Sequence, residues 1–157
     1  GKINVISSFQ ALWAYPDKYI KELTLPRLGK TRSNWNYPIN SIVKAGGRIS
    51  GGSDWTVTSL NPLDAIEVAV TRKEPGNKNG EALIPEEAVR LETILNAYTL
   101  GGAYSLYIED KVGSIEVGKL ADIVILDRNL FKIPDYEIHK AQVDYTIFHG
   151  EIIYERY

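Results

Sequence analysis

One strand followed by a capped helix constrains the fold of this chain more than any other stretch. Residues 48–53 are a short strand-like run that ends in glycines, and Asp54 comes directly after it. Asn61 then offers an N-cap side chain and Pro62 suits the first helical position, so residues 63–71 are predicted to form a helix with one buried face. A strand that leads into such a helix is the unit from which parallel sheets are built.

The rest of the chain predicts further helical units and then a separate β element, so the expected fold class is α/β. The expected elements are a strand over 2–9, an irregular aromatic segment over 10–36, one or two helical turns over 37–45, a polar loop over 72–83, a helix from 85 that ends or kinks at Gly101-Gly102, a short strand and turn over 114–119, a strand over 121–127 and a hairpin over 143–154.

Composition excludes several classes of protein. The chain has 157 residues, a length typical of one domain, and carries a net charge of −2 from 18 basic and 20 acidic residues. Because no basic stripe stands out, no nucleic-acid partner is expected. No apolar run is long enough to span a bilayer and residues 1–15 lack a secretory signal, so we expect no membrane partner and a cytoplasmic location. The absence of cysteine excludes disulfides, thiolate catalysis and cysteine metal sites.

Asp54 is the main candidate for chemistry. A carboxylate at the carboxyl end of a strand, before a helix, stands where α/β barrels place their active sites. It could act there as a metal ligand or as a general base, and the glycines before it allow close approach of the backbone. The alternative is an aspartate that caps a loop by accepting bonds from nearby backbone amides. Trp55 follows directly and would face the same mouth.

The other polar residues give weaker signals. His139 and His149 lack the spacing of a zinc site, and both are expected to lie on the surface. Arg72 ends the predicted helix, where it could face the mouth or simply complement the negative end of the helix dipole. The paired glycines have no phosphate-loop pattern and are explained better by helix termination, and no serine lies in a nucleophile elbow.

Two stretches together carry a family pattern. The first comprises Gly51-Gly52-Ser53-Asp54-Trp55, Asn61-Pro62-Leu63 and Ala69-Val70-Thr71-Arg72, and the second comprises Tyr98-Thr99, Gly102-Ala103-Tyr104 and residues 113–127 with the run Gly-Ser-Ile-Glu-Val-Gly-Lys-Leu-Ala-Asp. The first resembles the last barrel strand and helix of the amidohydrolase superfamily, in its YtcJ-like and N-substituted formamide deformylase-like branch. The second resembles the segment where such proteins enter their small β-sandwich. The match covers residues 40–157 and, more loosely, the strand at 1–10.

The resemblance implies a fold and an activity. Residues 1–110 would hold the last strands and helices of a (β/α)8 TIM barrel, and residues 111–157 would form part of a β-sandwich. The intact enzyme would hydrolyse non-peptide carbon–nitrogen bonds of a small molecule with a divalent metal, expected to be zinc. Asp54 would ligate that metal and handle the proton of the attacking water. Trp55 and Trp13 are the candidate contacts to the substrate, since Trp13 lies in the aromatic segment.

The departures from the family pattern are equally informative. The other metal ligands of the family, a His-x-His pair and histidines on earlier strands, have no counterpart in this sequence. One carboxylate cannot hold a catalytic zinc, which usually takes three protein ligands. We therefore expect a fragment of a longer enzyme that is inactive and metal-free alone, and that associates with itself or with the rest of the barrel. The alternative is a stand-alone, non-catalytic remnant that serves as a binding or scaffold domain.

Overall fold

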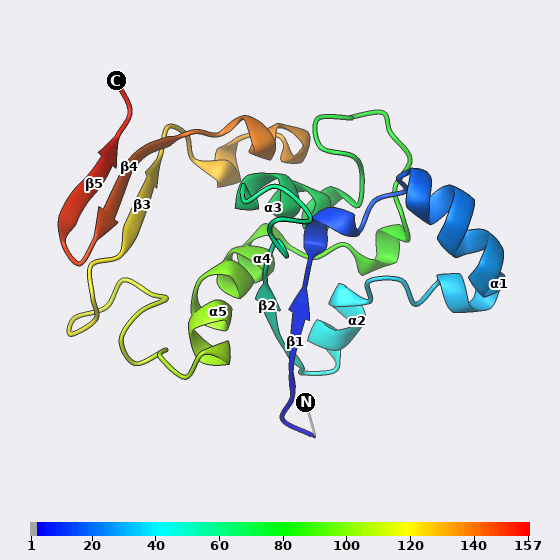
Figure 1. Cartoon of the computed structure of the whole chain (residues 1–157), viewed down its shortest axis with the longest axis horizontal. Coiled ribbons are helices and arrows are strands. Elements are labelled where there is room, and N and C mark those ends of the chain that lie inside the picture. The colour runs from blue at the N-terminus through cyan, green and yellow to red at the C-terminus, as the bar shows by residue number, and fades with distance from the viewer. Residues whose placement is uncertain (1–2) are drawn as a thin grey trace.

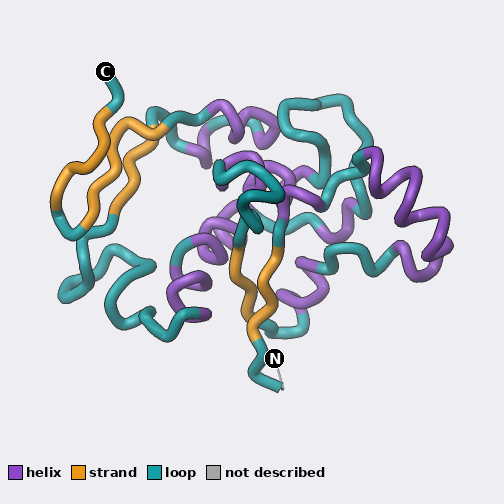
Figure 2. The backbone as a smooth tube through the Cα atoms, in the orientation of Figure 1, coloured by secondary structure: helices purple, strands orange, loops and turns teal. Residues whose placement is uncertain are grey.

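Two short parallel strands form the first sheet of the molecule (Figure 1; Figure 2). The computed structural model describes residues 3–157. Strand β1 (Ile6–Phe9) pairs with β2 (Arg48–Gly51), with Ile6 opposite Arg48 and Phe9 opposite Gly51. The strand predicted over residues 2–9 therefore begins only at Ile6, and Lys2 lies outside the described residues. A parallel pair needs a crossover connection, and residues 10–47 supply it.

The connection between β1 and β2 is largely helical, which corrects the expectation of an irregular segment over residues 10–36. It holds a 3₁₀ turn, η1 (Ala11–Trp13), a π-helical turn, η2 (Ile20–Thr24), and the helices α1 (Leu25–Ser33) and α2 (Ile39–Lys44). The carboxylate of Asp17 accepts a hydrogen bond from the amide of Ile20 at 2.7 Å and so caps the first helical turn. Gly29, with φ of 70°, kinks α1, so the helical pieces are too short to give a clear periodic pattern.

The predicted unit of strand and capped helix is confirmed. Helix α3 (Pro62–Thr71) follows β2 after a short loop, and the side chain of Asn61 accepts a hydrogen bond from the amide of Leu63 at 3.1 Å. Leu63 and Ile66 are buried on the face that meets the core. Local rules suffice here because the cap, the proline and the apolar spacing all favour the same helix.

Residues 85–105 form three helical pieces, where the sequence predicts one helix that ends or kinks at its paired glycines. A 3₁₀ turn, η3 (Pro85–Glu87), is followed by α4 (Leu91–Tyr98) and α5 (Leu100–Ser105). The break lies at Thr99, whose φ and ψ are −116° and −95°, whereas Gly101 and Gly102 lie inside α5. A Cβ atom on Gly101 would lie 2.4 Å from the carbonyl oxygen of Ile49. This glycine thus permits close packing of α5 on β2, and helix termination is the wrong interpretation.

Tertiary contacts of Glu87 delay the start of α4. Its carboxylate accepts hydrogen bonds from the amide of Ser41 at 2.8 Å and from the hydroxyl of Ser41, in the first turn of α2. The amide of Val89 donates to the carbonyl of Ala69 at 3.0 Å. These contacts hold residues 85–90 against α2 and α3, so the α-helix begins only at Leu91.

Three antiparallel strands form the second sheet at the carboxyl end of the chain (Figure 2). Strands β3 (Ile123–Leu126), β4 (Val143–Phe148) and β5 (Glu151–Glu155) lie in the order β3-β4-β5, and two 3₁₀ segments, η4 (Leu130–Lys132) and η5 (Asp135–Lys140), connect β3 to β4. The predicted hairpin is confirmed, and its turn has positive φ at His149 (50°) and Gly150 (84°). Of the short strand and turn predicted over residues 114–119, the turn is present at Val117 and Gly118, but no strand forms there.

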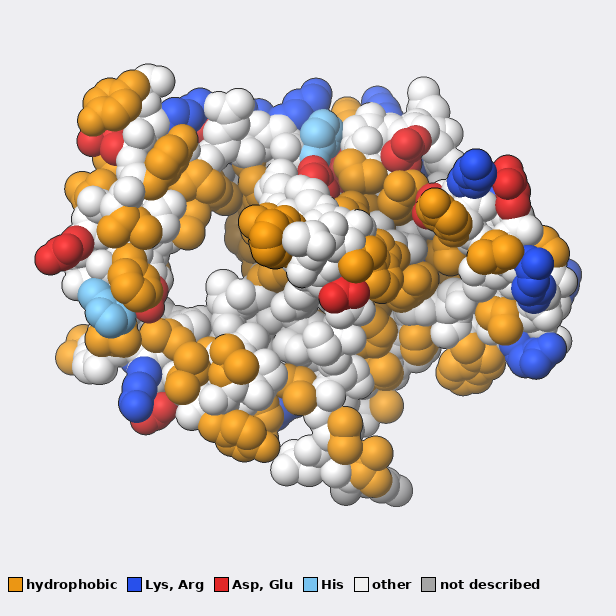
Figure 3. All heavy atoms as spheres, in the orientation of Figure 1, with side chains coloured by type: hydrophobic (Ala, Val, Ile, Leu, Met, Phe, Trp, Pro, Cys, Tyr) orange, Lys and Arg blue, Asp and Glu red, His pale blue; other side chains and the backbone are white. Residues whose placement is uncertain are grey.

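The core lies between the first sheet and α3 and α4, and it extends into the connection that leads to β4. Its buried members include Ile49 of β2, Ile66 of α3, Ile94 of α4 and Ile138 of η5. Of the second sheet, Leu126 of β3 packs against this core, and a hollow lies between the sheet and the helices (Figure 3). An apolar pocket of about 830 Å³ lies there, between α3, α4, α5 and the strands β3 and β4. Over residues 3–157, no helix is both long and apolar enough to cross a bilayer.

Candidate functional site

The carboxyl ends of the two parallel strands lie at the same end of the first sheet (Figure 1). The amide of Gly52 donates to the carbonyl of Phe9 at 3.1 Å, so the hydrogen bonding between the two segments continues for one residue beyond β2. Trp13 follows β1 within η1 and is half-buried, while Asp54 and Trp55 follow β2. Trp55 is exposed, with 62% of its surface accessible. The topology therefore brings all three predicted site residues to one edge of the sheet.

Asp54 stands exposed in a tight turn after β2. Its φ of 51° is in the left-handed region, which aspartate tolerates better than most residues, and its carbonyl accepts a hydrogen bond from the amide of Val57 at 2.8 Å. Ser53 organises the rest of the turn, since its hydroxyl accepts from the amide of Trp55 at 3.2 Å and its carbonyl accepts from the hydroxyl of Thr58. Ser53, and not the Asp54 carboxylate, thus makes the side-chain cap of this turn.

The side chain of Tyr98 contacts the end of β2, and the sequence did not predict it as a functional residue. A Cβ atom on Gly51 would lie 2.5 Å from Cε2 of the Tyr98 ring, so the ring fills the space that a side chain at Gly51 would need. The Tyr98 hydroxyl donates to the carbonyl of Gly52 at 3.4 Å. Burial of the ring raises the pKa of Tyr98 to about 12, so the phenol is neutral at physiological pH. The signal that could have found it is the glycine at the strand end, which requires a close neighbour.

His139 is paired with a buried carboxylate, which corrects its expected place on the surface. Its Nδ1 lies 2.7 Å from Oε2 of Glu67, and its backbone amide donates to the same oxygen at 2.8 Å. The amide of Gly76 donates to Oε1 of Glu67 at 2.6 Å, and Glu67 is almost fully buried in α3. A carboxylate inside an apolar helical face was visible in the sequence as Ile66-Glu67-Val68. His149, by contrast, is exposed in its hairpin turn, as expected.

Arg72 ends α3, where a cation complements the helix dipole, but its side chain lies inside the protein and does not face the mouth. The residue ends α3 with φ of 59° and is fully buried. Its guanidinium donates to the carbonyls of Leu83 at 2.7 Å, Tyr37 at 3.1 Å and Asn36 at 3.1 Å. Burial lowers the pKa of Arg72 to about 10, which leaves the group charged at neutral pH. Arg72 therefore ties α3 to two loops and does not face a substrate.

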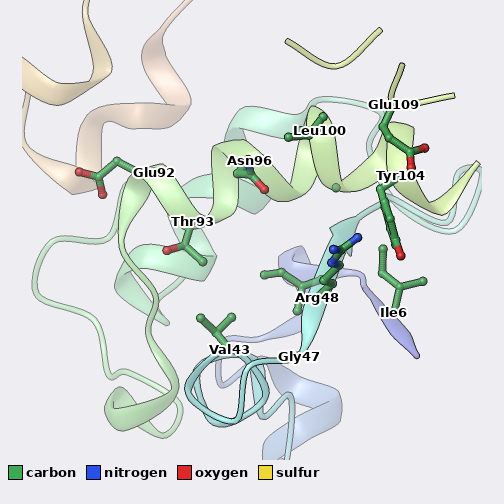
Figure 4. Close-up of a pocket in the computed structure, with 12 residues that line it drawn as sticks. Ile6, Val43, Gly47, Arg48, Glu92, Thr93, Asn96, Leu100, Tyr104 and Glu109 are labelled. Carbon is green, nitrogen blue, oxygen red and sulfur yellow. The ribbon is translucent and has the colours of Figure 1, made fainter. Parts of the chain in front are cut away.

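A second pocket lies at the opposite end of the first sheet (Figure 4). It has a volume of about 720 Å³, and Ile6 and Arg48, which begin the two strands, line it. The guanidinium of Arg48 stacks over the ring of Tyr104, with its carbon 3.9 Å from the ring centre. In α/β barrels the amino ends of the strands serve stability and the carboxyl ends serve chemistry. This pocket is therefore separate from the Asp54 edge.

The described residues of this chain do not form a metal site by themselves. Across residues 3–157, no group of three or more His, Cys, Asp and Glu side chains could hold one. Asp54 brings a single carboxylate, and the pair of Glu67 and His139 is already engaged in hydrogen bonds with backbone and with each other. A catalytic zinc normally takes three protein ligands, so the donor set at Asp54 does not fit a metal without additions.

Curated relatives match most of this chain but only part of their own length. The putative amidohydrolase YtcJ of Bacillus subtilis is 30% identical over 132 residues, which cover 84% of this chain and 25% of YtcJ. The N-substituted formamide deformylase of Arthrobacter pascens is 33% identical over 120 residues, covering 76% of this chain and 22% of the enzyme. A 5-methylthioadenosine/S-adenosylhomocysteine deaminase of Thermoanaerobacter pseudethanolicus is 33% identical, covering 75% and 28%. The chain thus spans about a quarter of the length of these relatives.

Solved structures agree with this relationship. A metal-dependent hydrolase of Pyrococcus furiosus is 26% identical with a TM-score of 0.65, covering 83% of this chain and 25% of that one. An adenosine deaminase of Xanthomonas campestris with bound zinc shares the fold at 24% identity and a TM-score of 0.56, covering 73% and 27%. The α/β fold is therefore confirmed. The model of the Amidohydrolase family matches residues 1–154. The resemblance found in the sequence is confirmed, and the chain belongs to the amidohydrolase family.

Proposed function

We propose that this chain is the carboxyl-terminal part of a metal-dependent amidohydrolase that cleaves non-peptide carbon–nitrogen bonds of a small molecule. The observation that carries the proposal is the position of Asp54, exposed three residues after the end of a strand of a parallel pair in a member of this family. The names of two relatives, a formamide deformylase and a deaminase, both describe reactions at carbon–nitrogen bonds.

The elements suit the end of a barrel followed by a second domain. In this proposal β1 and β2 are the last two strands of a (β/α)8 barrel, held within residues 1–110, and residues 111–157 form part of a β-sandwich. Parallel pairing of β1 and β2 and the helix that follows β2 are the barrel's repeating unit. The separate antiparallel sheet and its exposed apolar side chains suit one layer of a sandwich.

Asp54 supplies one carboxylate to a site that residues outside this chain complete. An exposed carboxylate can bind a divalent cation such as zinc and can accept and release a proton at the edge of a substrate pocket. Trp55 and Trp13, which follow the two strand ends, are the residues of this chain that would contact the substrate. Because the remaining ligands are absent, the 157-residue chain alone hydrolyses nothing and keeps no stoichiometric metal.

The test compares this chain with the full-length polypeptide, both supplied with zinc. The substrates are an N-substituted formamide and 5-methylthioadenosine, and the products measured are formate and ammonia. We expect activity only in the full-length protein, and Asp54→Asn lowers its kcat by about 100-fold or more. Asp110→Asn, at an exposed aspartate of a distant loop, is the matched control and leaves kcat within about twofold. Hydrolysis by the 157-residue chain, or an unchanged kcat in Asp54→Asn, would contradict the proposal.

One further check separates the fragment from a stand-alone scaffold or binding domain. The proposal requires a reading frame that encodes a His-x-His motif a few hundred residues upstream of residue 1. If the frame begins at residue 1, the chain is a non-catalytic remnant and the proposed activity is abandoned.

A further inference from the structure

Gly51 and Tyr98 form a close contact that any larger residue at position 51 would prevent. A Cβ atom on Gly51 would lie 2.5 Å from Cε2, 2.6 Å from Cδ2 and 2.7 Å from Cζ of the Tyr98 ring. Real side-chain atoms do not approach so closely, so the flat face of the ring lies directly against the backbone at the last residue of β2. The contact thus fixes the place of the strand end relative to α4.

The ring contributes more to this contact than the hydroxyl. The hydroxyl lies 3.4 Å from the carbonyl oxygen of Gly52, at the long end of the range for a hydrogen bond. The ring, in contrast, lies against the end of the strand, and it projects from α4, which Leu91, Ile94 and Ala97 anchor in the core. Removal of the ring would leave a cavity under Gly51, whereas removal of the hydroxyl alone would cost little.

A second glycine contact on the same strand makes the support rigid. Gly101 of α5 lies against the carbonyl of Ile49, two residues before Gly51. The strand is therefore held at two points by α4 and α5, and the chain leaves the sheet only after Gly52, whose amide still bonds to Phe9. Asp54 is three residues beyond Gly51, and the Gly52 carbonyl that the Tyr98 hydroxyl contacts comes directly before the turn that Ser53 and Asp54 begin.

We propose that Tyr98 is a positioning residue, whose ring sets the direction of the chain at the end of β2 and thereby the place of the Asp54 carboxylate. Its importance for catalysis rests on the proposed function of Asp54, but the contact itself does not. An error of about 1 Å in the place of a catalytic group can lower a rate by about 100-fold, so a residue that touches no substrate can still matter in this way.

Amide hydrogen exchange in the 157-residue chain tests the contact directly. We expect Tyr98→Ala to speed exchange at residues 52–54 by about tenfold or more relative to the amides of α3, because the strand end loses its support. Tyr98→Phe, which keeps the ring, changes that ratio by less than about threefold. Tyr104→Ala removes a neighbouring ring that contacts Arg48 at the other end of β2, and it leaves residues 52–54 as in the wild type. If Tyr98→Ala does not fold, Tyr98→Leu keeps the apolar volume without the flat ring and takes its place.

A double substitution tests whether the two residues act as a pair. Gly51→Ala alone drives its Cβ into the ring and speeds exchange at residues 52–54, whereas Gly51→Ala combined with Tyr98→Ala has room for that Cβ. We therefore expect the double variant to exchange more slowly than the product of the two single effects by about tenfold. Effects that simply multiply, or exchange at residues 52–54 that follows α3 in every variant, would overturn the inference.

Kinetics of the full-length protein then separate positioning from mere stability. Tyr98→Ala is expected to lower kcat by about tenfold or more with KM within about threefold. Tyr98→Phe, which keeps the ring, is expected to keep the kcat of the wild type. A kcat unaffected by Tyr98→Ala overturns the positioning role. If Asp54→Asn has no effect while the exchange pattern holds, the proposed function fails and the contact between Tyr98 and Gly51 stands.

Discussion

Arg72 illustrates how one buried charge can organise several segments. Its left-handed backbone at the end of α3 turns the chain, and its guanidinium donates to three carbonyl oxygens of two loops. Glu87 lies near enough to favour the charged form against the cost of burial. Three fixed donors on a planar group suit this task, and a lysine could not reproduce that geometry.

Replacement of Arg72 should therefore destabilise the protein strongly. Arg72→Met keeps much of the apolar stem but leaves the three carbonyls without their donor, so we expect the free energy of unfolding to fall by about 3 kcal/mol or more. Arg90→Met is the control, because Arg90 is exposed and pairs with the exposed Glu92. Urea denaturation should show a change of less than about 0.5 kcal/mol there. Equal midpoints for the two variants would contradict the buried clamp.

Tyr98 gives the protein a dependence on alkaline pH. Its pKa is about 12 in the folded state against about 10 in an unfolded chain, because burial disfavours the phenolate. The folded protein thus holds the phenol proton more tightly, and this contribution to stability is complete below pH 10 and is lost as the pH rises toward about 12. Unfolding measured from pH 9 to about 12 should lose less stability in Tyr98→Phe than in the wild type. Parallel pH profiles for the two proteins would contradict the burial of this group.

Among the elements, α3 is joined to several other segments through its polar side chains. Its Asn61 cap faces the loop from β2, its Arg72 end faces two loops, and its middle carries Glu67. Glu67 accepts hydrogen bonds from the amides of Gly76 and His139 and from the His139 ring, so it joins α3 to the polar loop and to η5. Through η5 the second sheet is attached to the first part of the chain.

Loss of the Glu67 carboxylate should loosen that attachment. Glu67→Ala removes a buried side chain and leaves the amides of Gly76 and His139 without an acceptor, so we expect a loss of about 2–4 kcal/mol in the free energy of unfolding. Exchange at the amides of Gly76 and His139 should rise more than exchange in β2, since only the former lose their acceptor. Glu22→Ala, at an exposed position of η2, serves as the control and should change neither quantity.

The elements also show what the sequence could predict and why the rest escaped it. The loop and cap around β2 and α3 follow from neighbours in the chain, such as Asn61 with Leu63, and these were predicted correctly. The start of α4 was misplaced because Glu87 bonds to Ser41, 46 residues away, and His139 was misplaced because its partner Glu67 is 72 residues away. Such pairings leave no local pattern. The position of Asp54 between a strand and a helix could be predicted because that order is itself local, whereas the metal role proposed for it would need ligands from outside this sequence.

At the scale of the whole molecule, the second sheet is poorly covered. An apolar row crosses all three strands, since Ile123 pairs with Ile147 and Ile147 with Ile152. Ile152 is 59% exposed, and the hollow between this sheet and the helices is apolar. The first sheet has only two strands, so each has an unpaired edge. Exposed apolar rows and open edges favour association with another chain or segment.

We therefore expect the 157-residue chain to self-associate in sedimentation velocity as its concentration rises. Ile152→Lys places a charge in the apolar row and should weaken that association by about tenfold or more, because a lysine cannot be buried unpaired in a contact. Val117→Lys adds the same charge on a fully exposed loop and should leave association within about twofold of the wild type. If the chain is the carboxyl-terminal part proposed above, addition of the remaining part of that protein should compete with self-association, since both would use the same surfaces. If the wild-type chain stays monomeric at every concentration, these surfaces do not drive association. If the two lysine variants weaken association equally, the change in net charge is the cause and the second sheet is not.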